Sequence, residues 1–199
     1  MDIGSCAAIL LAGGYSSRMG RDKAELEFDG RRLIELQLGK LLQAGVAEIV
    51  ISGYAKPLAG TVYVPDVYPH RGPLSGIHAG LLAIHRPSAL VLAVDTPLVP
   101  VSLLKELVSS HEGGARVVSH DGRLEPLIGI YDRSLAPACE TALLGSSTSM
   151  HRFLRETGCS ELPYQGDPTL LMNCNTPDEY RLACSRLREA PVHSQPPSL

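Results

Sequence analysis

The stretch that decides the fold is Ala7-Ala8-Ile9-Leu10-Leu11-Ala12-Gly13-Gly14-Tyr15-Ser16-Ser17-Arg18-Met19-Gly20-Arg21-Asp22-Lys23. Its apolar start predicts a buried strand, and the glycines and cations that follow predict a loop that binds phosphate. Glycine lets the backbone approach an anion closely, so that N–H groups point at phosphate oxygens. The loop has neither the Gly-x4-Gly-Lys-Ser/Thr spacing of a P-loop nor the Gly-x-Gly-x-x-Gly spacing of a dinucleotide site. It therefore indicates another kind of nucleotide site.

The composition is that of one globular domain. The chain has 199 residues, of which 44% are hydrophobic and 20% charged, and its net charge of -3 argues against a nucleic-acid surface. Its apolar runs are far shorter than the roughly 20 residues of a membrane span, and no secretory signal is visible. The five cysteines form no Cys-x-x-Cys pair and no zinc spacing. We expect reduced thiols in a cytoplasmic protein.

Strand-like runs alternate with helical patterns, which is typical of βαβ units and a parallel sheet. We expect strands at 6–11, 48–52, 61–64, 89–94, 115–120 and 127–131, and helices around 34–42 and at 74–85, 101–110, 134–144, 150–157 and 177–188. The prediction is an α/β fold: a single Rossmann-like domain over residues 1–189, with a mainly parallel sheet and helices on both faces. Residues 190–199 are polar and rich in proline, which predicts a disordered tail.

Three polar segments follow predicted strands. Residues 12–23 follow the first strand, Asp66 the third and Asp95 the fourth. Ligands of open parallel sheets bind at the carboxyl ends of the strands, so all three should face one crevice. Asp95 comes directly after a buried run, where an unpaired carboxylate would be costly. It is either a turn or N-cap residue or a ligand of Mg2+, which takes one or two carboxylates together with substrate phosphates.

Five motifs in order carry a resemblance to a known family. They are Leu-Ala-Gly-Gly-x-Ser-x-Arg-Met-Gly-x-Asp-Lys at 11–23, Gly72-Pro73-Leu74-Ser75-Gly76, Val94-Asp95-Thr96-Pro97, Glu125-Pro126-Leu127-Ile128-Gly129-Ile130-Tyr131 and Asn173-Cys174-Asn175-Thr176-Pro177. Over residues 6–188 the chain resembles the molybdenum cofactor guanylyltransferases. These belong to the nucleotidyltransferases that activate phosphorylated metabolites with an NTP, so the resemblance implies a fold like that of the nucleotide-diphospho-sugar transferases.

The resemblance also implies the roles of individual residues. Arg18, Lys23 and Asp95 would be catalytic, with Asp95 as the Mg2+ ligand. The nucleotide site would comprise Leu11, Ala12, Gly13, Gly14, Lys23, Ser52, Asp66 and Asp95. The Asp66 carboxylate suits the N1–H and N2–H2 donors of guanine, whereas Ser52 departs from the asparagine that family members often carry there. The alternative for Lys23 and Arg18 is that they are solvated surface charges, and Lys23 is expected to lie in a solvent-facing loop.

Four further residues are candidates for the second substrate, each with an alternative. Asn173 and Asn175 would orient that substrate or complete the outer shell of the metal, or they form an Asx turn at the end of a strand that holds Cys174. Arg123 and Glu125 would face the second substrate or belong to a plain exposed hairpin.

The implied reaction transfers GMP from MgGTP to the terminal phosphate of molybdopterin, with or without bound molybdenum, and releases pyrophosphate. A phosphate monoester is already ionised at neutral pH, so the attack needs no protein base. The alternatives are a molybdopterin cytidylyltransferase, a sugar-1-phosphate nucleotidyltransferase and a nucleotide sensor without catalysis. We expect a monomer that uses GTP and molybdopterin and binds no nucleic acid or membrane, with molybdoenzyme chaperones or other cofactor-biosynthesis proteins as further partners.

Overall fold

The structure is a computed structural model that describes residues 6–13, 15–16, 21–28, 30–56, 58–145 and 148–189. Its strands are β1 (Ala7–Leu11), β2 (Tyr15–Ser16), β3 (Arg21–Asp22), β4 (Glu27–Phe28), β5 (Arg31–Arg32), β6 (Glu48–Ser52), β7 (Val62–Val64), β8 (Ser88–Ala93), β9 (Ala115–His120), β10 (Arg123–Asp132) and β11 (Ser160–Pro163). Its α-helices are α1 (Leu33–Gln43), α2 (Pro73–Ala83), α3 (Val101–Ser109), α4 (Ala136–Leu144), α5 (Met150–Thr157) and α6 (Pro177–Glu189), and its 3-10 helices are Lys23–Glu25, Arg133–Leu135 and Pro168–Leu171.

One seven-stranded sheet organises the molecule, in the order β11-β9-β10-β8-β1-β6-β7. Strand β1 pairs in parallel with both β6 and β8, β6 pairs in parallel with β7, and β11 with β9. Strand β10 is antiparallel to both of its neighbours, β8 and β9. The sheet is therefore mainly parallel, as the sequence predicts.

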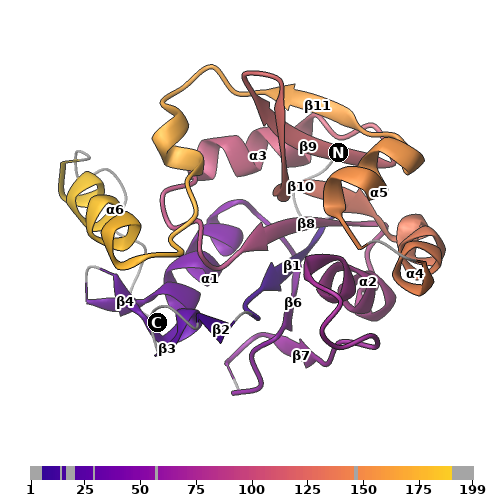
Figure 1. The fold of residues 1–199 in the computed structure, drawn as a ribbon, viewed down its shortest axis with the longest axis horizontal. Helices are drawn as coiled ribbons and strands as arrows, with labels where there is room; N and C mark the ends of the chain where they lie inside the picture. The colour runs from indigo at the N-terminus through magenta and orange to yellow at the C-terminus, as the bar shows by residue number, and fades with distance from the viewer. Residues whose placement is uncertain are drawn as a thin grey trace.

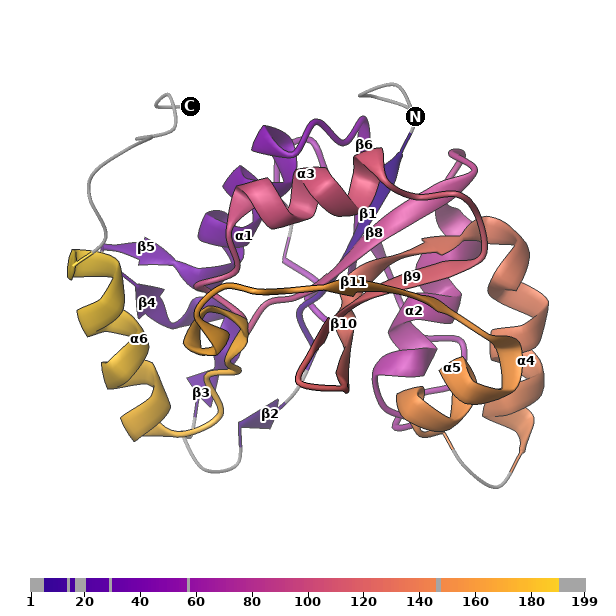
Figure 2. The same ribbon diagram turned by 90° about the horizontal axis from the view of Figure 1, so that it is seen from above.

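Helices cover both faces of this sheet (Figures 1 and 2), with α1 and α3 on one face and α2, α4 and α5 on the other. The side chains of β1 divide between the two cores, Ala8 and Leu10 in one and Ala7, Ile9 and Leu11 in the other. Successive side chains of a strand point to opposite faces, so a strand covered on both sides is apolar throughout. This confirms the predicted α/β fold.

Among the described residues, no helix has the length and apolarity to cross a bilayer.

The expected elements correspond closely to the observed ones. The predicted strand 48–52 and helix 150–157 have the observed bounds, and Gly45 ends α1 with a φ of 84°. The second hairpin strand was predicted from residue 127, but β10 begins at Arg123. The prediction started late because a register shift between Glu125 and Gly129 interrupts the alternation of apolar and polar side chains. The predicted helix 134–144 starts as a 3-10 turn and becomes α-helical at Ala136.

One strand was not predicted and one expectation was wrong. No strand was expected at β11, although this strand forms one edge of the sheet beside β9. Cys174, expected in a strand, is buried in an irregular segment before α6. Residues 190–199 lie outside the described residues, so the tail stays a prediction.

Candidate active site

The carboxyl ends of β1 and β6 meet in a very close backbone contact. The N–H of Ala12 donates to the carbonyl of Ser52 at 2.8 Å, one residue beyond the strand pairing. A Cβ on Gly53 would lie 2.2 Å from the Cα of Gly13, and Gly53 has a φ of +83°. Only glycine fits there, because any side chain would collide with backbone and would favour another conformation. Gly53 could not be singled out from the sequence, because the need for glycine there comes from Gly13, forty residues away.

A cation, a carboxylate and an amide meet at the end of β8. The ammonium of Lys23 donates to Oδ2 of Asp95 at 2.8 Å and also to Oδ1 of Asn175. The side chains of Lys23 and Asp95 are only 14% and 17% exposed, so the expectation of a solvent-facing Lys23 is wrong in this structure. A carboxylate so little hydrated needs a partner, and Lys23 supplies it. Three segments of the chain thus build one polar cluster.

The segment that carries Asn175 is fixed by two kinds of hydrogen bond. The N–H of Cys174 donates to the backbone carbonyl of Asp95 at 2.7 Å. The carboxylate of Glu179 accepts from the N–H groups of Asn175 and Thr176 at 2.8 Å each, which holds the pKa of Glu179 below its usual range. The turn before α6 is therefore capped by Glu179, and the side chain of Asn175 contacts Lys23.

A second carboxylate lies at the end of β6. Ser52 is 4% exposed, and its hydroxyl donates to Oδ1 of Asp66 at 2.6 Å. A Cβ on Gly76 of α2 would lie 2.7 Å from Oγ of Ser52, so glycine allows this close approach. The structure thus brings together Ser52 and Asp66, two of the residues expected in the nucleotide site. Leu11, Ala12 and Gly13 line the same end of the sheet, whereas Gly14 and Arg18 lie outside the described residues and stay predictions.

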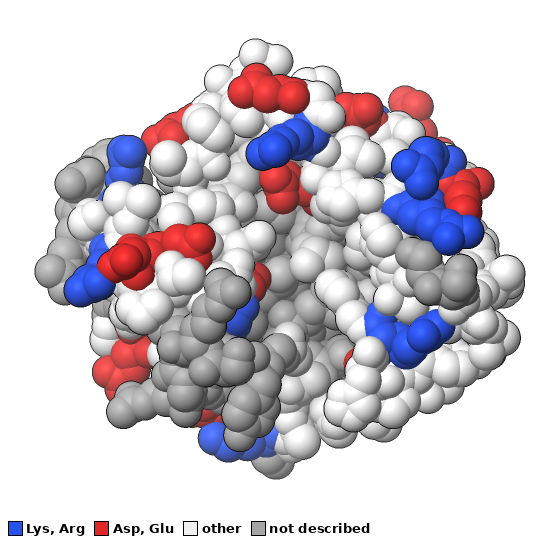
Figure 3. Space-filling model, viewed as in Figure 1, with Lys and Arg blue, Asp and Glu red and all other residues white. Residues whose placement is uncertain are grey.

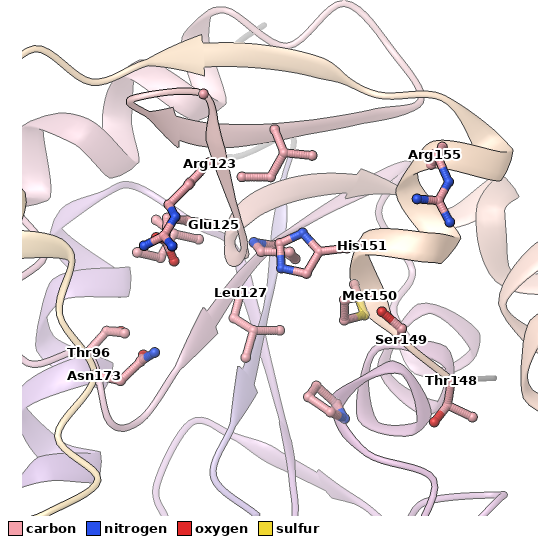
Figure 4. Close-up of a pocket in the computed structure, with 15 residues that line it drawn as sticks. Thr96, Arg123, Glu125, Leu127, Thr148, Ser149, Met150, His151, Arg155 and Asn173 are labelled. Atoms are coloured by element: carbon pink, nitrogen blue, oxygen red, sulfur yellow. The ribbon is translucent and has the colours of Figure 1, made fainter.

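A pocket of about 880 Å³ opens next to the cluster of Lys23, Asp95 and Asn175. It is lined by Pro73, Thr96, Gly122, Arg123, Leu124, Glu125, Pro126, Leu127, Ile128, Thr148, Ser149, Met150, His151, Arg155 and Asn173. Figure 3 shows the hollow in the middle of this face, and Figure 4 shows Thr96 and Asn173 on one side of it and Thr148 and Arg155 on the other. Because Thr96 follows Asp95 and Asn173 lies two residues before Asn175, the pocket adjoins the cluster.

Charged side chains of both signs line this pocket. Glu125 is partly buried, and its loss of hydration raises the pKa of its carboxyl, opposed by the nearby His151, Arg123 and His120. Arg123 and Glu125 therefore line a cavity. His151 and Arg155 were missed by the sequence analysis, because α5 shows only the pattern of an amphipathic helix.

The side chains around Asp95 suit a metal ion that is held by few protein ligands. Within the described part of the chain, no three His, Cys, Asp or Glu side chains gather where they could hold a metal ion. A metal at Asp95 would therefore take most of its ligands from water and from a bound phosphate, as Mg2+ does.

Comparison with known proteins gives a consistent family. The MobA-like NTP transferase domain matches residues 8–162. A molybdenum cofactor guanylyltransferase of Xanthomonas euvesicatoria pv. vesicatoria is 33% identical over 192 residues, covering 94% of this chain and 95% of that protein. One of Pseudomonas fluorescens is 32% identical over 183 residues, covering 87% and 90%.

Solved structures share the fold. Molybdopterin-guanine dinucleotide biosynthesis protein A from Archaeoglobus fulgidus has a TM-score of 0.75 and 25% identity, covering 92% of this chain and 99% of that chain. A Mycobacterium tuberculosis protein in complex with manganese has a TM-score of 0.70 and 17% identity, covering 90% and 98%. At that identity, the second likeness concerns the fold alone.

Proposed function

Because this chain belongs to the MobA-like NTP transferase domain family, we propose that it transfers GMP from GTP to the terminal phosphate of molybdopterin and releases pyrophosphate. The observation that carries the proposal is the Lys23–Asp95 pair at 2.8 Å, at the carboxyl end of β8 and beside a pocket for an acceptor. The names of the relatives support the choice of nucleotide and acceptor.

Asp95 would hold Mg2+. One carboxylate is enough, because Mg2+ is commonly held by one or two carboxylates plus substrate phosphates. When bound, the ion would supply positive charge at the phosphoryl oxygens. Lys23 donates to Oδ2 of Asp95 and to Oδ1 of Asn175, and the third N–H of its ammonium remains for a phosphate oxygen. Lys23 would therefore stabilise the negative charge that develops during transfer.

The chemistry needs positioning and charge, and no protein base. The acceptor phosphate is a dianion near neutral pH, and one of its oxygens attacks the α-phosphorus of GTP. A new P–O bond forms as the bond between the α-phosphorus and the bridging oxygen breaks, and pyrophosphate leaves with that electron pair. The described residues contribute Lys23 as the fixed cation and Asn175 as the group that orients it.

The acceptor would occupy the pocket of about 880 Å³. Arg123 and Arg155 give this pocket cations that suit an anionic acceptor, His151 adds a ring that can form hydrogen bonds, and Asn173 lies where the pocket meets the cluster (Figure 4). The partly buried Glu125 offers an acceptor of hydrogen bonds for N–H groups of the pterin ring. We propose that these residues orient the terminal phosphate toward Asp95.

The guanine base would be selected by Asp66. Its carboxylate accepts from Ser52 through Oδ1, which orients the group and leaves Oδ2 to accept from guanine. On this proposal Ser52 orients the carboxylate rather than contacting the base.

Calorimetry with GTP, CTP, ATP and UTP in the presence of Mg2+, followed by a pyrophosphate-release assay with molybdopterin, tests the proposal. Tightest binding of GTP and acceptor-dependent release of pyrophosphate would support it. Preference for CTP would indicate a molybdopterin cytidylyltransferase. Release of pyrophosphate that depends on a sugar 1-phosphate would indicate a sugar-1-phosphate nucleotidyltransferase. Binding of GTP without any turnover would indicate a nucleotide sensor.

A further inference from the structure

Helix α1 sends two polar side chains into the segment that carries Asp95. Gln37 is fully buried, and its amide Nε2 donates to the carbonyl of Ala93 at 3.0 Å, to that of Thr96 at 2.9 Å and to Oγ1 of Thr96 at 3.4 Å. One turn later, the ammonium of Lys40 donates to the carbonyl of Val99 at 2.9 Å and to that of Pro97.

These hydrogen bonds end on the last residue of β8 and on the connection between β8 and α3. The local backbone bonds here are long, since Thr96 N to Ala93 O and Val99 N to Thr96 O both measure 3.4 Å, while the hydroxyl of Thr96 donates to the carbonyl of Ala93 at 2.8 Å. The carbonyls of residues 93, 96, 97 and 99 thus all accept a hydrogen bond from α1 in addition to any local one. A buried carbonyl left without a partner is unfavourable, so these contacts restrain the loop on both sides of Asp95.

A lysine is unusual at position 40, where the ammonium is poorly hydrated. Loss of hydration lowers the pKa of Lys40 to about 7. The apolar buried positions of α1 are Leu33, Ile34 and Leu41, which pack in the core. An apolar side chain at position 40 would avoid the desolvation of an amine but would bond no carbonyl.

We propose that Gln37 and Lys40 are positioning residues that hold the 93–99 loop so that the Asp95 carboxylate meets Lys23 and the metal. This inference rests on the proposed role of Asp95. It separates two functions of α1: its apolar side chains stabilise the core, and Gln37 and Lys40 set the geometry of the reaction centre.

The test compares Gln37→Met, Lys40→Met and the double variant with Leu41→Ala. Leu41 is a fully buried neighbour on the same helix, and its truncation destabilises the core without removing a bond to the loop. We measure kcat, KM for GTP, the Mg2+ concentration for half-maximal rate, and binding of Mn2+ in the presence of GTP by paramagnetic resonance. All proteins are assayed at a temperature where urea titration shows each to be folded.

We expect the double variant to need at least about tenfold more Mg2+ and Mn2+ and to lose at least about tenfold in kcat, with KM for GTP within about twofold of wild type. We expect Leu41→Ala to match the wild type in all four quantities. If the double variant does not fold, the two single variants test the inference, and each should show a smaller change in metal dependence and kcat in the same direction. Gln37→Asn keeps the amide on a shorter side chain, and it should show the same direction of change as Gln37→Met.

Metal dependence and kcat equal to those of Leu41→Ala would overturn the inference. Asp95→Asn distinguishes this failure from failure of the proposed function. If Asp95→Asn is inactive while the α1 variants behave like Leu41→Ala, only the positioning role is lost. If Asp95→Asn retains full turnover, the proposed reaction centre itself is wrong.

Discussion

The ammonium of Lys23 lies 2.8 Å from Oδ2 of Asp95, and both side chains are mostly shielded from solvent. The two residues are 72 positions apart in the chain and belong to different segments at the carboxyl edge of the sheet. Each group satisfies the other, so neither charge stands unpaired in a poorly hydrated place. The pair is therefore a direct target for mutation.

Asp95→Asn should lower turnover by at least about a hundredfold, the scale of losing one major electrostatic group in a reaction centre. Asparagine is isosteric, so the fold should survive. Pyrophosphate release at saturating Mg2+ measures the effect, and Asp167→Asn, at an exposed N-cap that asparagine also serves, is the matched control. Near-normal turnover of Asp95→Asn would remove Asp95 from the mechanism.

Lys23→Met should weaken binding of MgGTP and slow pyrophosphate release. It should also lower the free energy of unfolding by about 1–2 kcal/mol, because the Asp95 carboxylate loses a charged hydrogen bond. Calorimetry and urea titration measure the two effects. Lys56→Met, at an exposed surface ion pair with Glu25, should change stability by less than about 1 kcal/mol. Unchanged GTP binding in Lys23→Met would return Lys23 to a structural role.

Asp66→Asn should erode the preference for GTP over CTP and ATP by about 1.5–3 kcal/mol, since one charged hydrogen-bond partner is lost. Ser52→Ala should also erode the preference for GTP, but by less, because the Asp66 carboxylate loses its hydrogen bond from Ser52 and remains in place. Competition binding among the nucleotides measures both. A selectivity that is indifferent to both variants would place base recognition elsewhere.

Glu125→Gln should raise KM for the acceptor and leave KM for GTP unchanged. Burial raises the pKa of Glu125, so its carboxylate is protonated at a higher pH than that of an exposed glutamate. If the acceptor needs the carboxylate, its KM in the wild type should rise as pH falls, and in Glu125→Gln that dependence should be absent. Parallel pH profiles in the two proteins would contradict this role.

Lys40 should make stability depend on pH. Burial lowers the pKa of Lys40 to about 7 in the folded protein from its ordinary value of 10.5, so between these values the unfolded chain binds more protons than the folded one. The free energy of unfolding should then rise with pH above 7, by at most about 1.36 kcal/mol per unit. Urea titrations at pH 7 and 9 should show this rise in the wild type and in Lys105→Met, on the exposed side of α3, but not in Lys40→Met.

Local sequence pattern was enough for most of the architecture. The apolar run of β1, the strand β6 and the helix α5 follow from periodicity, because side-chain spacing within one element depends on that element alone. The position of Asp66 and Asp95 after predicted strands was enough to bring them to one edge, since parallel strands share their carboxyl ends. Strand β11 was missed because it is short and lies mostly exposed at the sheet edge, where no clear alternation marks it.

The sequence by itself determined an α/β domain and the placement of carboxylates at the edge of its sheet. Only the tertiary structure decided that Lys23 pairs with Asp95 and Asn175, that Ser52 donates to Asp66, and that Gln37 and Lys40 bond the loop around Asp95. These contacts join residues that are far apart in the chain, and the pattern around any one residue carries no information about its distant partner. The packing of α1 and of the 173–175 segment against the end of β8 supplies that information.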